Sequence, residues 1–270
     1  KRHLLTNAVP AMPGGGTVLY VNPTDHTFIA DPQRREEGGT PAIVEAIRAG
    51  LVFKLQQDVG TATIEAKEKD FRTRALARWR DNPAIEVLGN TANDSLAIFS
   101  LRLTCDTITG RRDLHYGFVV ALLNDLFGIQ ARGGCSCAGR YAHNLLDIDE
   151  AESRKIEADI EEGSVFSKPG WVRVNFNYFI EEAAFEYILK AIELIASHGE
   201  KLKQQYNYDE SSGVFVYQGK TVSSGNNISR CFLDGALPLK PIREDDVSSE
   251  ENDVNQYLKQ SLARAASILC

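Results

Sequence analysis

Residues 171–195 change their hydrophobic period within a few positions. From Val172 to residue 177, apolar side chains occupy every second position, which is typical of a strand with one buried face. After residue 180 they recur every three or four positions, which is typical of an amphipathic helix. The members of this helical stripe are Phe185, Ile188, Leu189, Ile192 and Ile195. A strand and a helix that each have one apolar face must bury it against other elements, so this segment predicts a mixed α+β domain.

The same two periods occur on the N-terminal side of this segment. Residues 84–89 and 95–103 are strand-like and are joined by a turn-rich connection, so they predict a hairpin. Residues 117–128 are apolar and end at Gly128, which predicts a helix stopped by a glycine. The remaining elements expected here are a strand over 129–132 and helices over 141–146 and 150–163.

The first 80 residues predict sheet followed by helix. Glycine and proline separate two short strands, over 13–22 and 26–31. A helix is then expected to run to Val59, with Thr40 as its N-cap and Pro41 as its first helical residue. A second, charged helix is expected over 64–80. Its side chains are spaced for ion pairs one turn apart, namely Glu65 with Lys69 and Glu68 with Arg72.

The last 70 residues read as an extension without internal repeats. Residues 206–219 predict a hairpin, residues 242–251 a polar linker, and the C-terminal residues an amphipathic helix.

Charge and composition exclude several classes of protein. Thirty Lys and Arg against 37 Asp and Glu give a net charge of −7 without a basic block, so we expect no nucleic-acid partner and no membrane partner. The longest apolar stretches fall far short of the ~20 residues of a membrane helix, and the N-terminus lacks a signal-peptide pattern. Five cysteines, an odd number, favour reduced thiols. We therefore expect a protein of the cytoplasm or an organelle lumen, not a secreted one.

Two short motifs are candidates for binding anions. Gly39 and Thr40 combine a flexible backbone with a hydroxyl group beside the start of a helix, where free N–H groups favour a phosphate. An ordinary capped helix explains the same residues. Arg173 shares a strand face with two amides and could grip a carboxylate at two points, although an arginine on the wet face of a sheet is the commoner case.

The loop around Cys135 and Cys137 has three interpretations. A metal site needs further ligands, and His143 is the one candidate nearby, so we expect no metal. A reactive thiol fits better, because Arg132 and Arg140 can stabilise a thiolate in a glycine-rich loop. Inert, buried cysteine is the third interpretation.

Taken in order, four motifs resemble the C-terminal part of a pyridoxal-phosphate enzyme of aminotransferase class V, the family of cysteine desulfurases and selenocysteine lyases. The resemblance covers roughly residues 1–200. The motifs are PGGGTV (13–18), REEGGTPAI (35–43), LLNDLFGIQARGGCSCAG (122–139) and PGWVRVNFNYFI (169–180). It implies pyridoxal 5′-phosphate as cofactor, an amino acid as substrate and a homodimer with shared active sites.

The resemblance also implies roles for single residues. Gly39 and Thr40 match the loop that binds the cofactor phosphate of the other subunit, and Arg173 matches the arginine that holds the substrate α-carboxylate. The pattern Arg-x-Gly-x-x-Cys falls on Arg132, Gly134 and Cys137, so Cys137 matches the catalytic cysteine that accepts sulfur.

Two departures from the family pattern matter. The closest desulfurases have histidines just before this cysteine, where this chain has Cys135 and Ser136, which puts desulfurase chemistry itself in doubt. In addition, the family's Schiff-base lysine lies about a dozen residues before the stretch that matches Lys1. The chain begins at Lys1 and its one methionine is Met12, so we expect a fragment that lacks this lysine and is inactive alone.

We therefore expect the α/β plus α+β architecture of pyridoxal-phosphate fold type I, with the end of the large domain followed by the small domain. The expected division is large domain 1–80, small domain with the cysteine loop and substrate arginine 81–240, and linker with final helix 241–270. The expected function is that of a class V enzyme acting on an amino acid, most closely a cysteine desulfurase or selenocysteine lyase, with aminotransferase and epimerase also open. The alternative is a non-catalytic protein of the same fold that serves in sulfur relay or protein interaction.

Overall fold

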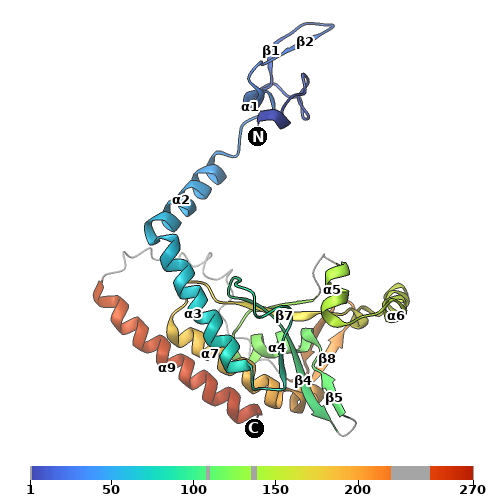
Figure 1. Ribbon diagram of the computed structural model, residues 1–270, viewed down its shortest axis with the longest axis vertical. Coiled ribbons are helices and arrows are strands. Elements are labelled where there is room, and N and C mark those ends of the chain that lie inside the picture. Colours follow the sequence, from blue (N-terminus) through green and yellow to red (C-terminus); the bar gives the residue numbers. More distant parts are fainter. Residues whose placement is uncertain (1, 108–109, 135–138, 220–243, 270) are drawn as a thin grey trace. The chain divides into compact units, whose positions relative to one another are not determined.

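The computed structural model describes residues 2–107, 110–134, 139–219 and 244–269 (Figure 1). The chain forms two compact units, residues 1–64 and residues 65–270, and each is described by itself. The domain limits expected at residues 80 and 240 stay a prediction.

The first unit consists of a hairpin and one long helix. After a 3₁₀ turn at Arg2–Leu4, β1 (Val18–Val21) pairs antiparallel with β2 (His26–Phe28), in the order expected from the glycine and proline breaks. The short helix α1 (Pro32–Arg35) starts at Asp31, whose carboxylate accepts a hydrogen bond from the Arg34 N–H at 2.9 Å. Helix α2 (Ile43–Val59) follows.

The start of α2 differs from the prediction. The N-cap is Ala42, no side chain caps the helix, and Thr40 lies two residues before the cap. The Ile43 N–H donates to the Pro41 carbonyl at 2.8 Å, so the chain makes a tight turn after the proline. This turn delays the helical register by two residues, and the expected capping role of Thr40 is therefore wrong.

The second unit is built on an antiparallel sheet with the strand order β3-β4-β7-β6, and β5 pairs with the far end of β4. Strand β6 begins three residues later than expected, and β5 was not expected from the sequence. The strands are β3 (Ile85–Val87), β4 (Ile98–Thr107), β5 (Gly110–Asp113), β6 (Arg132–Gly134) and β7 (Trp171–Asn175).

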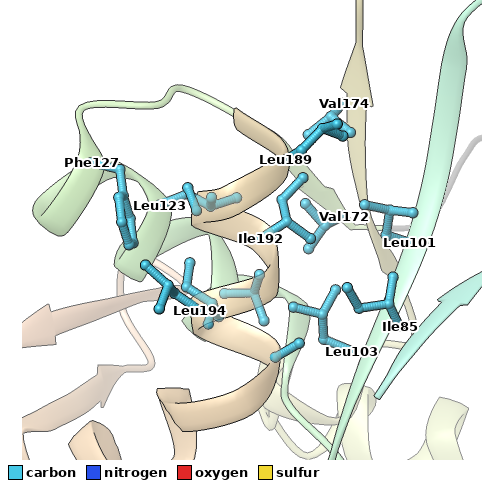
Figure 2. Close-up of a cluster of buried hydrophobic side chains, with 14 of the residues drawn as sticks. Ile85, Leu101, Leu103, Leu123, Phe127, Val172, Val174, Leu189, Ile192 and Leu194 are labelled. Atoms are coloured by element: carbon cyan, nitrogen blue, oxygen red, sulfur yellow. The ribbon is translucent and has the colours of Figure 1, made fainter. Parts of the chain in front are cut away.

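Helices α3 (Thr61–Trp79), α4 (Tyr116–Phe127), α7 (Glu182–His198) and α9 (Glu244–Leu269) provide most of the helical part of the core. Figure 2 shows Leu123 and Phe127 of α4 and Leu189 and Ile192 of α7 gathered with apolar side chains of β3, β4 and β7. As expected, α4 ends at Gly128, which has the left-handed φ of 65°. The predicted α+β domain is thus present, with one sheet face buried.

The expected ion pairs within α3 are replaced by contacts to other segments. The Lys69 Nζ lies 3.2 Å from the Asp94 carboxylate, and Arg72 donates to the carbonyls of Thr91 and Asn93, both at 2.8 Å. The Glu68 carboxylate accepts from the Tyr178 N–H at 3.3 Å. The reason is tertiary: fixed polar groups of neighbouring loops lie within reach of this helix face, and they compete with partners one turn away.

The segment between β6 and β7 carries α5 (Gly139–Leu146), α6 (Glu150–Glu161) and a 3₁₀ turn at Val165–Ser167. His143 holds α5 to α6, because its ring nitrogens lie 2.7 Å from the Gly139 carbonyl and 2.8 Å from the Ser153 hydroxyl. This histidine therefore has a structural role.

The C-terminal extension packs on the same unit. A 3₁₀ helix (Gly199–Gln205) leads into the predicted hairpin of β8 (Tyr206–Asp209) and β9 (Val214–Tyr217). Helix α9 packs on α7, with Ala265 and Leu269 in the core. It already begins at Glu244, so most of the segment expected to be a polar linker is helical. Among the described residues, no helix is long and apolar enough to cross a membrane.

Candidate functional site

The open face of the sheet in the second unit carries the candidate substrate residue. Along β7, Val172 and Val174 point into the core, while Arg173 and Asn175 are exposed. This is the alternation expected from the sequence, with one exception: Trp171 shares the face of Arg173 but is buried. Arg173 therefore lies on the solvent-facing side of the sheet, on the inner strand β7.

The strand register places a second arginine directly beside Arg173. Arg132 of β6 is the partner of Arg173 in the antiparallel pair, and Ser100 of β4 is its partner on the other side. Side chains directly opposite each other in such a pair share a face, with Cβ atoms about 5 Å apart. The structure thus forms a row Arg132–Arg173–Ser100 across three strands, and the two arginines lie at its outer end.

These two arginines have no acidic partner within 4 Å among the described residues, and both are exposed. The contrast with Arg102, on the same face of β4, is clear. Its guanidinium lies 2.6 Å from the Glu86 carboxylate and 3.9 Å from that of Asp113. Like charges directly opposite in a sheet destabilise it. The Arg132–Arg173 pair is therefore a surface that an anion would stabilise.

The cysteine loop follows β6 directly. Residues 135–138 lie outside the described residues, so the structure does not place Cys135 or Cys137. The residue before this loop is described. Gly134, the register partner of Trp171, has a φ of 118°, which residues other than glycine rarely adopt. The glycine of the Arg-x-Gly-x-x-Cys pattern therefore provides a backbone bend at the entrance to the loop.

The second anion motif, Gly39 and Thr40, lies in the first unit. A Cβ added at Gly14 would lie 2.0 Å from the carbonyl oxygen of Gly38, so the loop before β1 packs backbone to backbone against the loop that carries the motif. A Cβ added at Gly39, in contrast, would meet nothing within 4 Å, and Thr40 is exposed. The motif is supported on one side and open on the other, which fits a phosphate group arriving from outside the unit.

The substitution Gly14→Ala is expected to displace this loop, because the added methyl group overlaps the backbone of Gly38. Overpacking of this kind typically costs ~1–3 kcal/mol. Gly15→Ala is the matched control, since nothing lies within 4 Å of its added Cβ. Amide NMR shifts of Gly38 and Gly39 measure the effect. They should change strongly for the first variant only, and equal changes in both would contradict the close packing.

The substitution Thr40→Ala is expected to leave the stability of α2 unchanged, because Thr40 does not cap this helix. A true N-cap would cost about 1 kcal/mol when replaced by alanine. If the hydroxyl contacts a bound phosphate group, the same variant is expected to weaken the binding of that group. Thermal unfolding and a phosphate-ligand titration separate the two effects, and a stability loss with unchanged ligand affinity would restore the capping role.

The comparisons with known proteins identify the family. The sequence profile described as aminotransferase class V matches residues 1–180. The chain belongs to the aminotransferase class V family. The resemblance expected from the four motifs is thereby confirmed.

Curated relatives of this class V chain are desulfurases. A probable cysteine desulfurase of Halobacterium salinarum is 28% identical over 148 residues, which cover 55% of this chain and 33% of the relative. A cysteine desulfurase of Dickeya dadantii is 30% identical over 135 residues, which cover 50% and 30%. The matched part thus spans about a third of the length of these relatives.

A solved structure shows the fold of this class V chain. The crystal structure of the cysteine desulfurase CsdA from Escherichia coli matches 72% of this chain and 40% of its own, with a TM-score of 0.50 and 19% identity. The fold is that of the pyridoxal-phosphate enzymes of fold type I, as expected.

The structure brings together some of the candidate residues of this class V chain. Arg173 and Arg132 form one surface, whereas Gly39 and Thr40 belong to the other unit, and Cys137 lies outside the described residues. The sequence pattern assigned Arg132 only to the thiol loop and missed its position beside Arg173. Strand register, which places the two residues together, is not visible in either segment alone.

Proposed function

We propose that the intact protein is a pyridoxal-phosphate-dependent enzyme that acts on an amino acid, with chemistry of the cysteine desulfurase or selenocysteine lyase type. The observation that carries this proposal is the exposed Arg132–Arg173 surface, which lacks acidic partners among the described residues and stands at the strand that leads into the cysteine loop. The desulfurase relatives support the same chemistry.

The residues of this chain could bind the phosphate group of the cofactor and the carboxylate group of the substrate. The open backbone at Gly39 and the exposed Thr40 hydroxyl would hold the phosphate, across a homodimer interface as in the family. No lysine of this chain matches the one that carries the cofactor in the family. When bound, pyridoxal phosphate withdraws electrons from the α-carbon of the amino acid.

Arg173 would hold and orient the substrate. Its planar guanidinium can donate two parallel hydrogen bonds to the α-carboxylate, which fixes the amino acid in position and in orientation. Its strand is anchored by the buried Val172 and Val174, so the base of the side chain is held rigidly. A fixed clamp of this kind lowers the entropic cost of bringing the substrate to the reacting groups.

Cys137 would accept the sulfur. Its thiolate forms a bond to the sulfur atom of the substrate, the bond between that sulfur and the substrate β-carbon breaks, and the electron pair of the broken bond stays with the carbon. Cys137 then carries a persulfide, and the carbon is later protonated. The positive charge of Arg132 or Arg140 near the loop would favour the thiolate.

The substitution Arg173→Lys tests the clamp in the intact enzyme. It is expected to weaken amino-acid binding by about 10-fold to 100-fold, because a point charge replaces a two-point donor at a cost of ~1–3 kcal/mol. Cofactor affinity is expected to change little. Arg102→Lys, on the same face but paired with Glu86, is the control and should bind substrate normally. Equal substrate affinity of wild type and Arg173→Lys, as measured by titration, would remove Arg173 from the site.

A further inference from the structure

We propose that His115 is a proton-sensitive latch. In its neutral form it holds the C-terminal hairpin β8–β9 and the 3₁₀ turn at Val165–Ser167 on the start of α4, and protonation releases them. The inference is independent of the proposed function, because all of these contacts lie within the second unit and the test needs neither cofactor nor substrate.

The hydrogen bonds of His115 determine its protonation state. His115 is the N-cap of α4, and its Nδ1 accepts a hydrogen bond from the Gly117 N–H at 3.1 Å. Its Nε2 lies 3.2 Å from the Phe166 carbonyl oxygen, which can only accept, so Nε2 carries the proton. An imidazolium ring has N–H groups at both nitrogens and would set two donors against each other at Gly117. Protonation therefore removes the cap of α4.

Aromatic rings surround this imidazole from α4, the turn and the hairpin. Tyr116 of α4 and Phe166 of the turn stack on it, with ring centroids 4.4 and 4.6 Å away. The hairpin contributes Tyr208 at 5.9 Å and Phe215 at 5.2 Å. Burial in this cluster lowers the pKa of His115, and the hydrogen bond to Phe166 opposes this only in part. The His115 ring is thus the common contact of the three segments.

No acidic group compensates a positive charge on this ring. In the part of the chain that the structure describes, no carboxylate lies within 4 Å of the His115 nitrogens. The charged and titratable groups of the elements packed around it are Arg102 (β4), Asp113 (β5), Tyr116 (α4), Lys168 (after the turn), and Tyr208, Asp209 and Glu210 (hairpin). The Asp113 carboxylate lies 3.9 Å from Arg102, and burial raises the pKa of Tyr208, which stays neutral.

The direction of the pH effect follows from these contacts. The stacked rings attract a cation, but they offer no acceptor for a second N–H. Folding therefore favours the neutral ring of His115. The stability that this ring contributes is present above its ordinary pKa of 6.5 and is lost as the pH falls through the lowered pKa of the folded state.

Tyr116 connects this latch to the entrance of the cysteine loop. Besides stacking on His115, its ring packs on two glycines, since a Cβ added at Gly133 or Gly170 would lie 2.9 or 2.8 Å from its ring carbons. The Cβ added at Gly170 would also lie 2.6 Å from the carbonyl carbon of Gly134. Because Gly170 follows the turn that His115 holds, release of the turn is expected to change the surroundings of Gly134.

An NMR titration of the full chain from about pH 8 to about pH 5 tests the latch. The His115 ring signals are expected to titrate with a midpoint below 6.5. The amide signals of Gly213, in the hairpin, and of Gly170 should shift with the same midpoint. Deuterium exchange of the β8–β9 amides, corrected for the intrinsic effect of pH, should become at least about 10-fold faster.

Variants assign this response to His115. His115→Asn keeps a good N-cap without a titrating ring, so the hairpin signals should no longer depend on pH. If this variant loosens the hairpin at every pH, His115→Phe, which keeps a stacked ring, should give the same flat response. His26→Asn, which changes an exposed histidine of the other unit, is the control and should leave the transition as in the wild type. Tyr116→Leu should keep the hairpin transition and lose that of Gly170.

The latch is wrong if His115 titrates while the signals of Gly213 and the hairpin stay unchanged. It is also wrong if His115→Asn or His115→Phe keeps the pH response, because another group is then responsible. A His115 ring that stays neutral until the whole chain unfolds would overturn the proton sensitivity. A hairpin response without any change at Gly170 would overturn the release of the turn.

Discussion

If the intact protein has the proposed function, replacing Cys137 with alanine is expected to abolish the release of sulfur or selenium from the substrate while amino-acid binding persists. The alanine side chain has no atom that can accept sulfur, whereas the groups expected to bind the amino acid, including Arg173, are unchanged. A sulfide assay measures turnover, and a substrate titration measures binding. We expect a loss beyond the detection limit in the first and a change of less than about 2-fold in the second.

Two cysteines serve as controls for this variant. Cys135→Ala should keep turnover, unless the two loop thiols form a redox pair. Cys105 is partly buried, and burial raises the pKa of its thiol, with a smaller contribution from Glu200. It should therefore react with an alkylating agent more slowly than Cys137, since the thiolate fraction and exposure set this rate. Full turnover in Cys137→Ala would end the desulfurase interpretation and favour a general class V aminotransferase.

The substitution Phe185→Ala is expected to destabilise the second unit by ~3–5 kcal/mol, the usual cost of removing a buried phenylalanine. The Phe185 side chain is fully buried. Its ring centroid lies 4.6 Å from that of Phe71 and 4.8 Å from that of Phe176, and the Arg74 guanidinium lies over the ring, 4.6 Å from the centroid. The variant therefore loses both an apolar contact area and a cation–π contact.

Urea denaturation of the full chain measures this effect. Phe179→Ala is the matched control, because it removes the same side chain from a site that is 68% exposed. We expect its free energy of unfolding to change by less than about 0.5 kcal/mol. Equal shifts in the two variants would contradict the placement of Phe185 at the centre of the aromatic cluster.

Local pattern predicted the elements whose formation depends on one buried face. The alternation from Val172 onward predicted β7, because a strand buries every second side chain. The stripe through Phe185 predicted α7, because a helix buries every third or fourth side chain. Gly128 predicted the end of α4 because its left-handed conformation is cheap for glycine alone.

The pattern failed where a contact with another segment decides the structure. Strand β5 (Gly110–Asp113) is polar and fully exposed, so it has no hydrophobic periodicity that could predict it. It forms by pairing with the C-terminal end of β4. The start of α2 depends on a turn after Pro41. The side chains of α3 pair with loop carbonyls and Asp94, which lie elsewhere in the sequence.

The sequence by itself determined the family, through four motifs in order, and the exposed face of Arg173, through an alternation that sends every second side chain of β7 away from the core. Only the tertiary structure decided which residue stands beside it. Arg132 and Arg173 belong to distant segments, and a shift of one residue in the β6–β7 ladder would send Arg132 to the opposite face. The packing of the sheet on its helices holds this register, which places the two arginines side by side on the open face of the sheet.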